Sequence, residues 1–204
     1  MIRTFVALEL SQPLKEGILA LTRQIAKRGV RASWAKPGTM HLTLKFLGDV
    51  EEERIPDVTR AVGASAARVT PFAFETGGLG AFPTSRRPRV LWVGVNPAPG
   101  LFALQEAVDD ELALLGFPEE EDRYRPHVTL GRLRDPRGAE GLPELLAELS
   151  APAVTVEVKE VLVMKSTLAA GGAVHERLAA IPLGGRAPSR GPDGGDEDPR
   201  RSER

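Results

Sequence analysis

Residues 41–44 read His-Leu-Thr-Leu, and residues 127–130 repeat this sequence almost unchanged as His-Val-Thr-Leu. Polar and apolar residues alternate in both stretches, a pattern typical of a β-strand with one buried face. Side chains two residues apart on a strand point to the same side, so His41 shares a face with Thr43, and His127 with Thr129. The chain has three histidines, and two of them lie in this repeat. These two strands are therefore the first candidates for a functional site.

The predicted elements around the two His-x-Thr strands form an α+β pattern that occurs about twice along the chain. Each half carries one of the two strands, which predicts two related lobes, each a small sheet backed by helices. The polar faces of the two strands would then look at each other across a cleft. The predicted strands cover residues 2–10, 30–35, 40–47, 72–79, 89–95, 127–132, 154–164 and 173–183, and the predicted helices cover 12–28, 51–70, 101–115 and 142–149.

The composition limits the class of protein. With 204 residues, 42% of them hydrophobic and 27% charged, the chain is typical of a soluble globular protein. The net charge of −1 provides no overall attraction to nucleic acid or to an anionic membrane, so contact with RNA would have to be local. The absence of cysteine excludes disulfides and thiolate sites. Because no apolar run has membrane-spanning length and no signal peptide is recognisable, we expect a cytoplasmic protein.

The C-terminal segment differs from the rest of the sequence. After Leu183 the chain consists mainly of Gly, Pro, Arg, Asp, Ser and Glu, without apolar residues to anchor it beyond isolated alanine. Such a composition cannot offset the entropy cost of ordering. The sequence therefore predicts one folded domain over residues 1–183 and a disordered tail over residues 184–204.

Two facing His-x-Thr pairs suit acid–base chemistry on a phosphate. An imidazole has an ordinary pKa of about 6.5, so one ring can accept a proton while the other donates one near neutral pH. Threonine hydroxyls can donate to phosphate oxygens. A zinc site is the alternative, but the sequence shows no third ligand at suitable spacing, so we expect no metal and no cofactor. The pattern points to phosphoester cleavage by water or by a ribose hydroxyl.

Two longer stretches carry a family resemblance. Residues 41–48, His-Leu-Thr-Leu-Lys-Phe-Leu-Gly, and residues 126–132, Pro-His-Val-Thr-Leu-Gly-Arg, resemble the paired signatures of the 2H phosphoesterase superfamily, in particular the LigT-like RNA 2′,3′-cyclic phosphodiesterases. Residues 3–7 and 164–168 are similar to that family too, so the resemblance covers about residues 1–183. It implies a bilobal, pseudo-symmetric α+β fold in which two antiparallel sheets line a central cleft, with helices on the outside.

The resemblance also implies an activity and a partner. The expected reaction is hydrolysis of a 2′,3′-cyclic phosphate at an RNA 3′ end to a 2′-phosphate, and family members can also join tRNA halves through a 2′–5′ bond. The expected form is a monomer that acts on RNA or oligonucleotide ends. The alternative is a binding module for nucleotides or RNA ends that has no catalytic activity; the presence of both histidines argues against it.

The resemblance assigns roles to five residues. His41 would protonate the departing ribose 3′ oxygen and His127 would activate water, although a nearly symmetric site could use either ring in either role. Thr43 and Thr129 would hold phosphate oxygens, and Arg132 would lie near the phosphate. Strict alternation puts Arg132 on the face opposite His127, so this role requires a bulge or a strand end. The alternative for Arg132 is an exposed arginine in a salt bridge.

Several neighbouring side chains have weaker predictions. By alternation Lys45 shares the face of His41, and we expect a solvated lysine at the cleft rim, while Phe46 lies on the opposite face. His175 occupies a position where the family more often has tyrosine, and we expect it to be structural or peripheral. The aromatic rings that could stack on a base are Phe5, Trp34 and Tyr124, of which Phe5 is expected in the core.

Overall fold

Two antiparallel sheets form the framework of the protein. The computed structural model describes residues 1–119, 123–133, 141–170 and 172–184. The first sheet has the strand order β3-β1-β8-β9 and the second has the order β2-β6-β5-β4-β7. Every strand pair is antiparallel. The strands are β1 (Ile2–Glu9), β2 (Ala32–Trp34), β3 (His41–Val50), β4 (Phe72–Thr84), β5 (Arg87–Val95), β6 (His127–Leu133), β7 (Thr155–Val158), β8 (Glu160–Ala169) and β9 (Gly172–Pro182).

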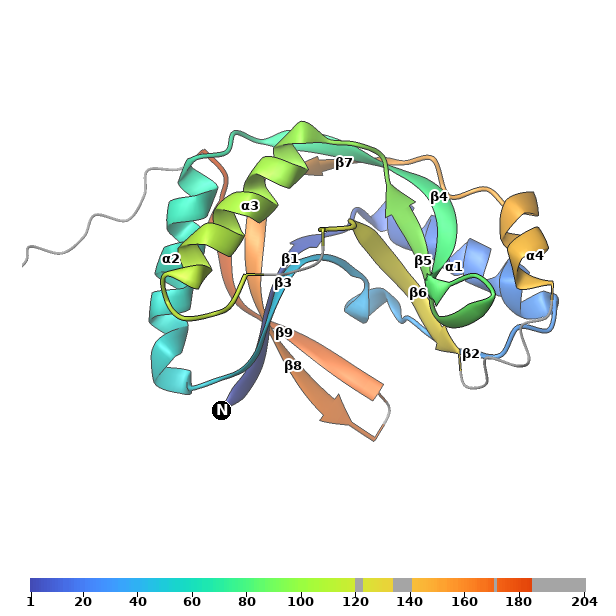
Figure 1. Cartoon of the computed structure of the whole chain (residues 1–204), viewed down its shortest axis with the longest axis horizontal. Coiled ribbons are helices and arrows are strands. Elements are labelled where there is room, and N and C mark those ends of the chain that lie inside the picture. Colours follow the sequence, from blue (N-terminus) through green and yellow to red (C-terminus); the bar gives the residue numbers. More distant parts are fainter. Residues whose placement is uncertain (120–122, 134–140, 171, 185–204) are drawn as a thin grey trace, which may run out of the picture.

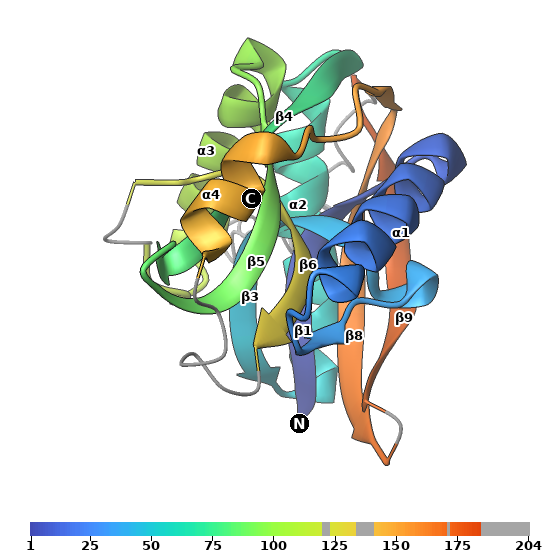
Figure 2. The same cartoon turned by 90° about the vertical axis from the view of Figure 1, so that its right-hand side faces the viewer.

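The helices cover the outer sides of the two sheets (Figure 1). Helices α2 (Ile55–Ala67) and α3 (Pro99–Ala113) lie against the first sheet, and α1 (Gln12–Lys27) and α4 (Leu142–Glu148) lie beside the second, as Figure 2 also shows. Two short 3₁₀ turns, Pro37–Thr39 and Glu52–Arg54, precede β3 and α2. Helix α1 buries one stripe of apolar side chains at helical spacing, namely Leu14, Ile18, Leu21 and Ile25. This arrangement confirms the predicted α+β fold with two antiparallel sheets.

The two lobes are interleaved along the chain rather than consecutive. The first sheet takes β1 and β3 from the N-terminal part of the chain and β8 and β9 from its C-terminal part. The chain leaves the first sheet after β1, forms α1 beside the second sheet, and returns to the first sheet at β3. Strand β1 is buried along Thr4–Leu8, which requires a neighbouring strand on each side, and β3 and β8 supply them. A simple division into two sequential halves therefore does not describe this fold.

Three strand predictions are wrong. The predicted strand over residues 154–164 is two strands, β7 and β8, which belong to different sheets, and β8 continues to Ala169. Gly48 and Asp49 do not end β3, which stays paired with β1 as far as Val50. Strand β4 does not end at Leu79 either but continues to Thr84, and Gly80 lies where a side chain of the adjacent strand β5 crosses over the sheet. A Cβ atom at Gly80 would lie 2.2 Å from the Trp92 ring, so the indole rests directly on this glycine. Glycine here permits close packing rather than a turn.

Two further observations concern the ends and the surface of the chain. The predicted tail, apart from Gly184, lies outside the described residues, and its disorder stays a prediction. Within the ranges given above, the structure has no helix that is both long and apolar enough to cross a membrane.

Candidate active site

Each His-x-Thr strand contains a β-bulge directly after its threonine. In β3, Thr43 pairs with Ala7 and Lys45 with Val6, so Leu44 is the extra residue. In β6, Thr129 pairs with Trp92 and Gly131 with Leu91, so Leu130 is the extra residue there. A bulge adds one residue to one strand and reverses the inward and outward alternation beyond it. The residue at position five after each histidine is therefore brought to the histidine's own face.

The bulge in β6 determines which face of the strand carries Arg132. Strict alternation predicts the face opposite His127, whereas the bulge places Arg132 on the face of His127 and Thr129. The side chain is exposed, and its positive charge lowers the pKa of His127. Arg132 therefore lies close enough to the candidate site to act on it electrostatically.

The bulge in β3 makes the predictions for Lys45 and Phe46 wrong. Lys45 is 2% exposed, and its ammonium donates to Asp109 of α3 and, over 2.6 Å, to the carbonyl oxygen of Pro118. Phe46 is 60% exposed and occupies the face that carries His41. The lysine thus ties the sheet to a helix, and the phenylalanine presents apolar surface to the cleft.

Both histidines are held by the same local hydrogen bond. Nδ1 of His41 lies 2.9 Å from the carbonyl oxygen of Thr39, and Nδ1 of His127 lies 2.7 Å from the carbonyl oxygen of Arg125. A carbonyl oxygen only accepts, so Nδ1 must carry the proton in each ring. In a neutral ring the unprotonated nitrogen is then Nε2. Each strand therefore offers one Nε2 atom that can take up or, once protonated, give up a proton.

The two imidazoles lie among different rings. His41 contacts Phe5 and His175, with ring centroids 4.7 and 4.9 Å away. His127 contacts Phe82 at 4.9 Å and lies 6.5 Å from the Trp92 ring centroid. His175 is therefore part of the site and not peripheral, which sequence alone could not show because it depends on where β9 lies in the sheet.

Burial lowers the proton affinity of both histidines. The pKa of His41 falls to about 4, first because the ring is buried and then because protonated His175 and His127 would repel its charge. The contribution of His127 to this shift shows that charges on the two lobes act on each other across the cleft. Burial is also the main reason that the pKa of His127 is lowered, with a further contribution from Arg132. Both rings are thus mainly neutral at pH 7 while the site is empty of anions.

A pocket of about 430 Å³ opens between the two lobes beside His127, whereas His41, Thr129 and Arg132 are not among the residues that line it. Thr43 lines it from the first lobe and His127 from the second, together with Phe46, Phe82 and the segment Arg123–Arg125. Tyr124 closes one side, and its hydroxyl donates to the carbonyl oxygen of Thr43 over 2.8 Å. The pocket therefore brings together an acid–base side chain, the threonine hydroxyl, three cationic side chains and three aromatic rings.

Of the three aromatic rings predicted to be available to a base, Tyr124 lines the pocket between the lobes, whereas Phe5 and Trp34 do not. Phe5 is buried, as expected, and Trp34 packs against Gly131. Phe46 and Phe82 also line the pocket between the lobes. Alternation conceals Phe46, because it is the bulge that turns this ring toward the cleft.

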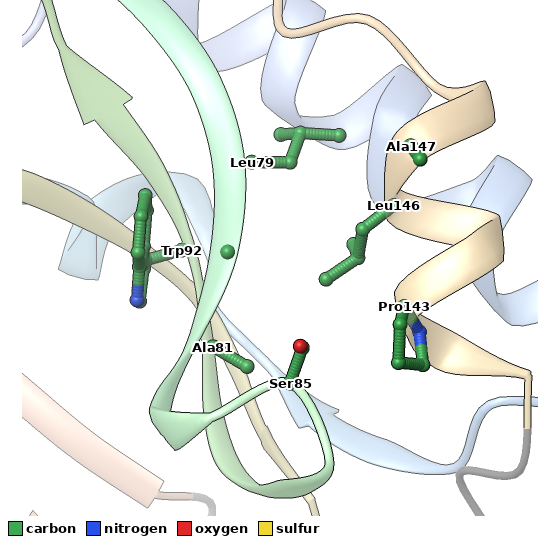
Figure 3. Close-up of a pocket in the computed structure, with 8 residues that line it drawn as sticks. Leu79, Ala81, Ser85, Trp92, Pro143, Leu146 and Ala147 are labelled. Carbon is green, nitrogen blue, oxygen red and sulfur yellow. The ribbon is translucent and has the colours of Figure 1, made fainter.

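A second hollow lies on the other side of the second sheet. It has a volume of about 380 Å³ and lies between the β4–β5 hairpin and α4, where Leu79, Pro143 and Leu146 line it (Figure 3). Ser85 supplies the one hydroxyl side chain among its lining residues. This hollow contains no acid–base group, so the cleft between the lobes is the better candidate for chemistry. Among the residues that the structure describes, no three His, Cys, Asp or Glu side chains are grouped to hold a metal ion.

Comparison with known proteins agrees with this geometry. The chain is 32% identical over 183 residues to an RNA 2′,3′-cyclic phosphodiesterase of Methanothermobacter thermautotrophicus, covering 89% of this chain and 99% of the relative. It is 35% identical over 168 residues to an RNA 2′,3′-cyclic phosphodiesterase of Aeropyrum pernix, covering 81% and 94%.

Solved structures show the same fold. The crystal structure of a Thermus thermophilus protein, TT0787, has a TM-score of 0.73 at 26% identity, covering 90% of this chain and 99% of that one. The structure of Escherichia coli LigT complexed with 3′-AMP has a TM-score of 0.70 at 24% identity, covering 89% and 97%. The model of the 2′-5′ RNA ligase superfamily matches residues 15–169. The chain belongs to the 2′-5′ RNA ligase superfamily.

Proposed function

We propose that this protein is an RNA 2′,3′-cyclic phosphodiesterase that opens a terminal cyclic phosphate to a 2′-phosphate by two-histidine acid–base catalysis. The single observation that carries the proposal is the matched state of His41 and His127. Each ring donates Nδ1–H to a backbone carbonyl, and the two lie close enough to influence each other's charge. Relatives with this activity in their names, matched over most of their length, support it.

In the proposed reaction, one histidine serves each side of the phosphorus atom. His127 accepts a proton from water through Nε2 as the water oxygen bonds to phosphorus. The bond from phosphorus to the ribose 3′ oxygen breaks, and protonated His41 gives its proton to that oxygen. Thr43, Thr129 and Arg132 donate to the non-bridging oxygens, where negative charge concentrates. The products are a 3′-hydroxyl and a 2′-phosphate, and no metal or cofactor takes part in the proposed steps.

The proton affinity of His41 sets a condition on this assignment. With a pKa of about 4, His41 carries no proton at pH 7 before substrate binds. The negative charge of a bound phosphate raises the pKa of a nearby imidazole and thereby favours its protonated form. In this mechanism substrate binding therefore favours protonation of His41, the catalytic acid. The reverse assignment, with His41 as base and His127 as acid, needs the same step at His127, whose pKa is also lowered, and the nearly symmetric site permits it.

We further propose that the RNA end binds in the pocket between the lobes. Phe46 and Phe82 can stack on bases, and Arg123 and Arg125 can contact phosphates of the chain. We further propose a monomeric enzyme of the cytoplasm, able to catalyse the reverse joining through a 2′–5′ bond when suitable ends are supplied.

The test is cleavage of an oligonucleotide that ends in a 2′,3′-cyclic phosphate, in the presence of a chelator. We expect wild-type turnover to a 2′-phosphate, and a loss of at least about a hundredfold in kcat for both His41→Ala and His127→Ala, the size typical of general acid–base catalysis. Lys159→Ala, an exposed surface change, is the matched control. Tight binding of a 2′-phosphorylated nucleotide without any turnover would instead identify a binding module, and full activity in both histidine variants would refute the mechanism.

A further inference from the structure

The third histidine of the chain lies beside the first one in the cleft. His175 belongs to β9, which is separated from β3 by β1 and β8 in the first sheet. Its ring meets His41 edge-to-face, with a centroid distance of 4.9 Å and an angle of 67° between the rings. Its contact with Phe5 has the same angle at 5.0 Å, and Phe5 in turn lies 4.7 Å from His41. The three rings therefore form a closed triangle in which His41 has two aromatic neighbours.

The surroundings of His175 keep it neutral. Its Nδ1 atom is enclosed and has no hydrogen-bond partner. Protonation of both nitrogens would bury an N–H group without an acceptor, which is costly. The neutral ring with its proton on Nε2 avoids this cost, and burial accordingly lowers the pKa of His175.

The charged groups near His175 are already paired with one another. Arg177, on the same strand, donates to Glu9 of β1 over 2.6 Å, and Lys165 of β8 lies 3.6 Å from Glu176. On β3 the titratable group that faces His175 is His41. None of the ion pairs found among the described residues joins a carboxylate to His175. A positive charge on His175 would therefore have no counterion and would oppose a charge on His41.

We propose that His175 is a positioning residue that holds the His41 ring in the orientation that presents Nε2 to the cleft. The single hydrogen bond from His41 to Thr39 fixes one atom of the ring but still allows the ring plane to rock about that atom. The edge of His175 on one side and the ring of Phe5 on another remove this freedom. This inference rests on the proposed function of His41 and adds a residue through which that function is controlled.

The effect on turnover separates His175 from a general structural role. We expect His175→Ala to lower kcat about tenfold to a hundredfold, the cost of a poorly oriented catalytic group, with KM within about twofold of wild type. His175→Phe keeps an aromatic edge at this place and should recover most of the loss. In a His41→Ala background, His175→Ala should have no further effect, because His175 acts through His41. Val174→Ala changes the exposed neighbour on the same strand and is the control.

The three histidines of the chain also make a direct spectroscopic test simple. In ¹⁵N-labelled protein the ring nitrogens of His41 should report a proton on Nδ1, and those of His175 a proton on Nε2. In His175→Ala we expect the His41 signals to shift toward a mixture of tautomers, while the His127 signals stay unchanged. Unmoved His41 signals, or an equal loss of activity in Val174→Ala, would overturn the positioning role. If wild-type protein fails to open cyclic phosphates, the proposed function fails, but the ring signals still decide the role of His175.

Discussion

The two lobes build their halves of the cleft from one backbone pattern and different side chains. In each lobe a histidine and a threonine are followed by a bulged leucine, Leu44 in β3 and Leu130 in β6. The next residue is a buried lysine in the first lobe and a glycine in the second. The residue after that, on the face of the histidine, is Phe46 in the first lobe and Arg132 in the second. The shared backbone thus supplies two equivalent histidines, and the bulges supply two unlike neighbours.

The difference between Phe46 and Arg132 indicates how two lobes with nearly the same backbone can bind an asymmetric substrate. An RNA end has an apolar base on one side of the terminal phosphate and negative oxygens around the phosphorus. Phe46 offers stacking surface in the first lobe, and Arg132 offers positive charge in the second. The rings around the histidines differ in the same way, because His41 lies against Phe5 and His175 whereas His127 lies against Phe82 and Trp92.

Removing Arg132 should have the largest effect on the difference between the lobes, because Arg132 is the cationic side chain that the second lobe has in the place of Phe46. We expect Arg132→Ala to lower kcat about a hundredfold, the usual cost of losing one donor to a developing negative charge. The pKa of His127 should rise, since the charge of Arg132 lowers it in the wild type. Steady-state kinetics and a histidine titration by NMR measure the two effects. Arg60→Ala, on the outer helix α2, is the matched control, and a variant of Arg132 with unchanged kcat would exclude its role at the phosphate.

Lys45 tests the buried side of the bulge in the first lobe. Lys45→Met takes the ammonium partner away from the Asp109 carboxylate, which should lower the free energy of unfolding by about 3 kcal/mol. Adding Asp109→Asn should restore part of the lost stability, because the carboxylate charge that faced the lysine is then gone as well. Urea denaturation measures both. The exposed pair of Lys159 and Glu157 provides the control, for which we expect no measurable change, and a double variant no more stable than Lys45→Met would place the cause elsewhere.

The limits of sequence-based prediction follow from these same residues. Alternation identifies the faces of His41, Thr43, His127 and Thr129 correctly, because the bulges come after them. Leu44-Lys45-Phe46 continues to look like a regular strand, so the reversal is invisible in the residue pattern.

In the second lobe a signal does exist, since an isolated glycine within a strand suggests a bulge or a close approach. A Cβ atom at Gly131 would lie 2.8 Å from the Trp34 ring and 3.0 Å from the Ser33 carbonyl oxygen. His175 could not be placed at all without the strand order, because it is the place of β9 in the first sheet, next to β8, that brings its ring to His41.

The smallest expected effect is a pH dependence of the free energy of unfolding, and it compares the proton affinities of the two histidines. Folding lowers the pKa of His41 from 6.5 to about 4, so the unfolded chain takes up a proton at a higher pH than the folded protein. Stability should therefore be constant above about pH 7 and fall as the pH drops through 6.5 toward 4.

His41→Gln removes this dependence, and relative to that variant wild type should lose about 1 kcal/mol of unfolding free energy between pH 7 and pH 5.5. Urea midpoints at several pH values measure the difference. Relative to His127→Gln, wild type should also lose stability as the pH falls, since the pKa of His127 is lowered too. An identical pH dependence of stability in wild type and His41→Gln would mean that folding does not lower the pKa of His41. The proposal that substrate binding protonates His41 would then have no basis.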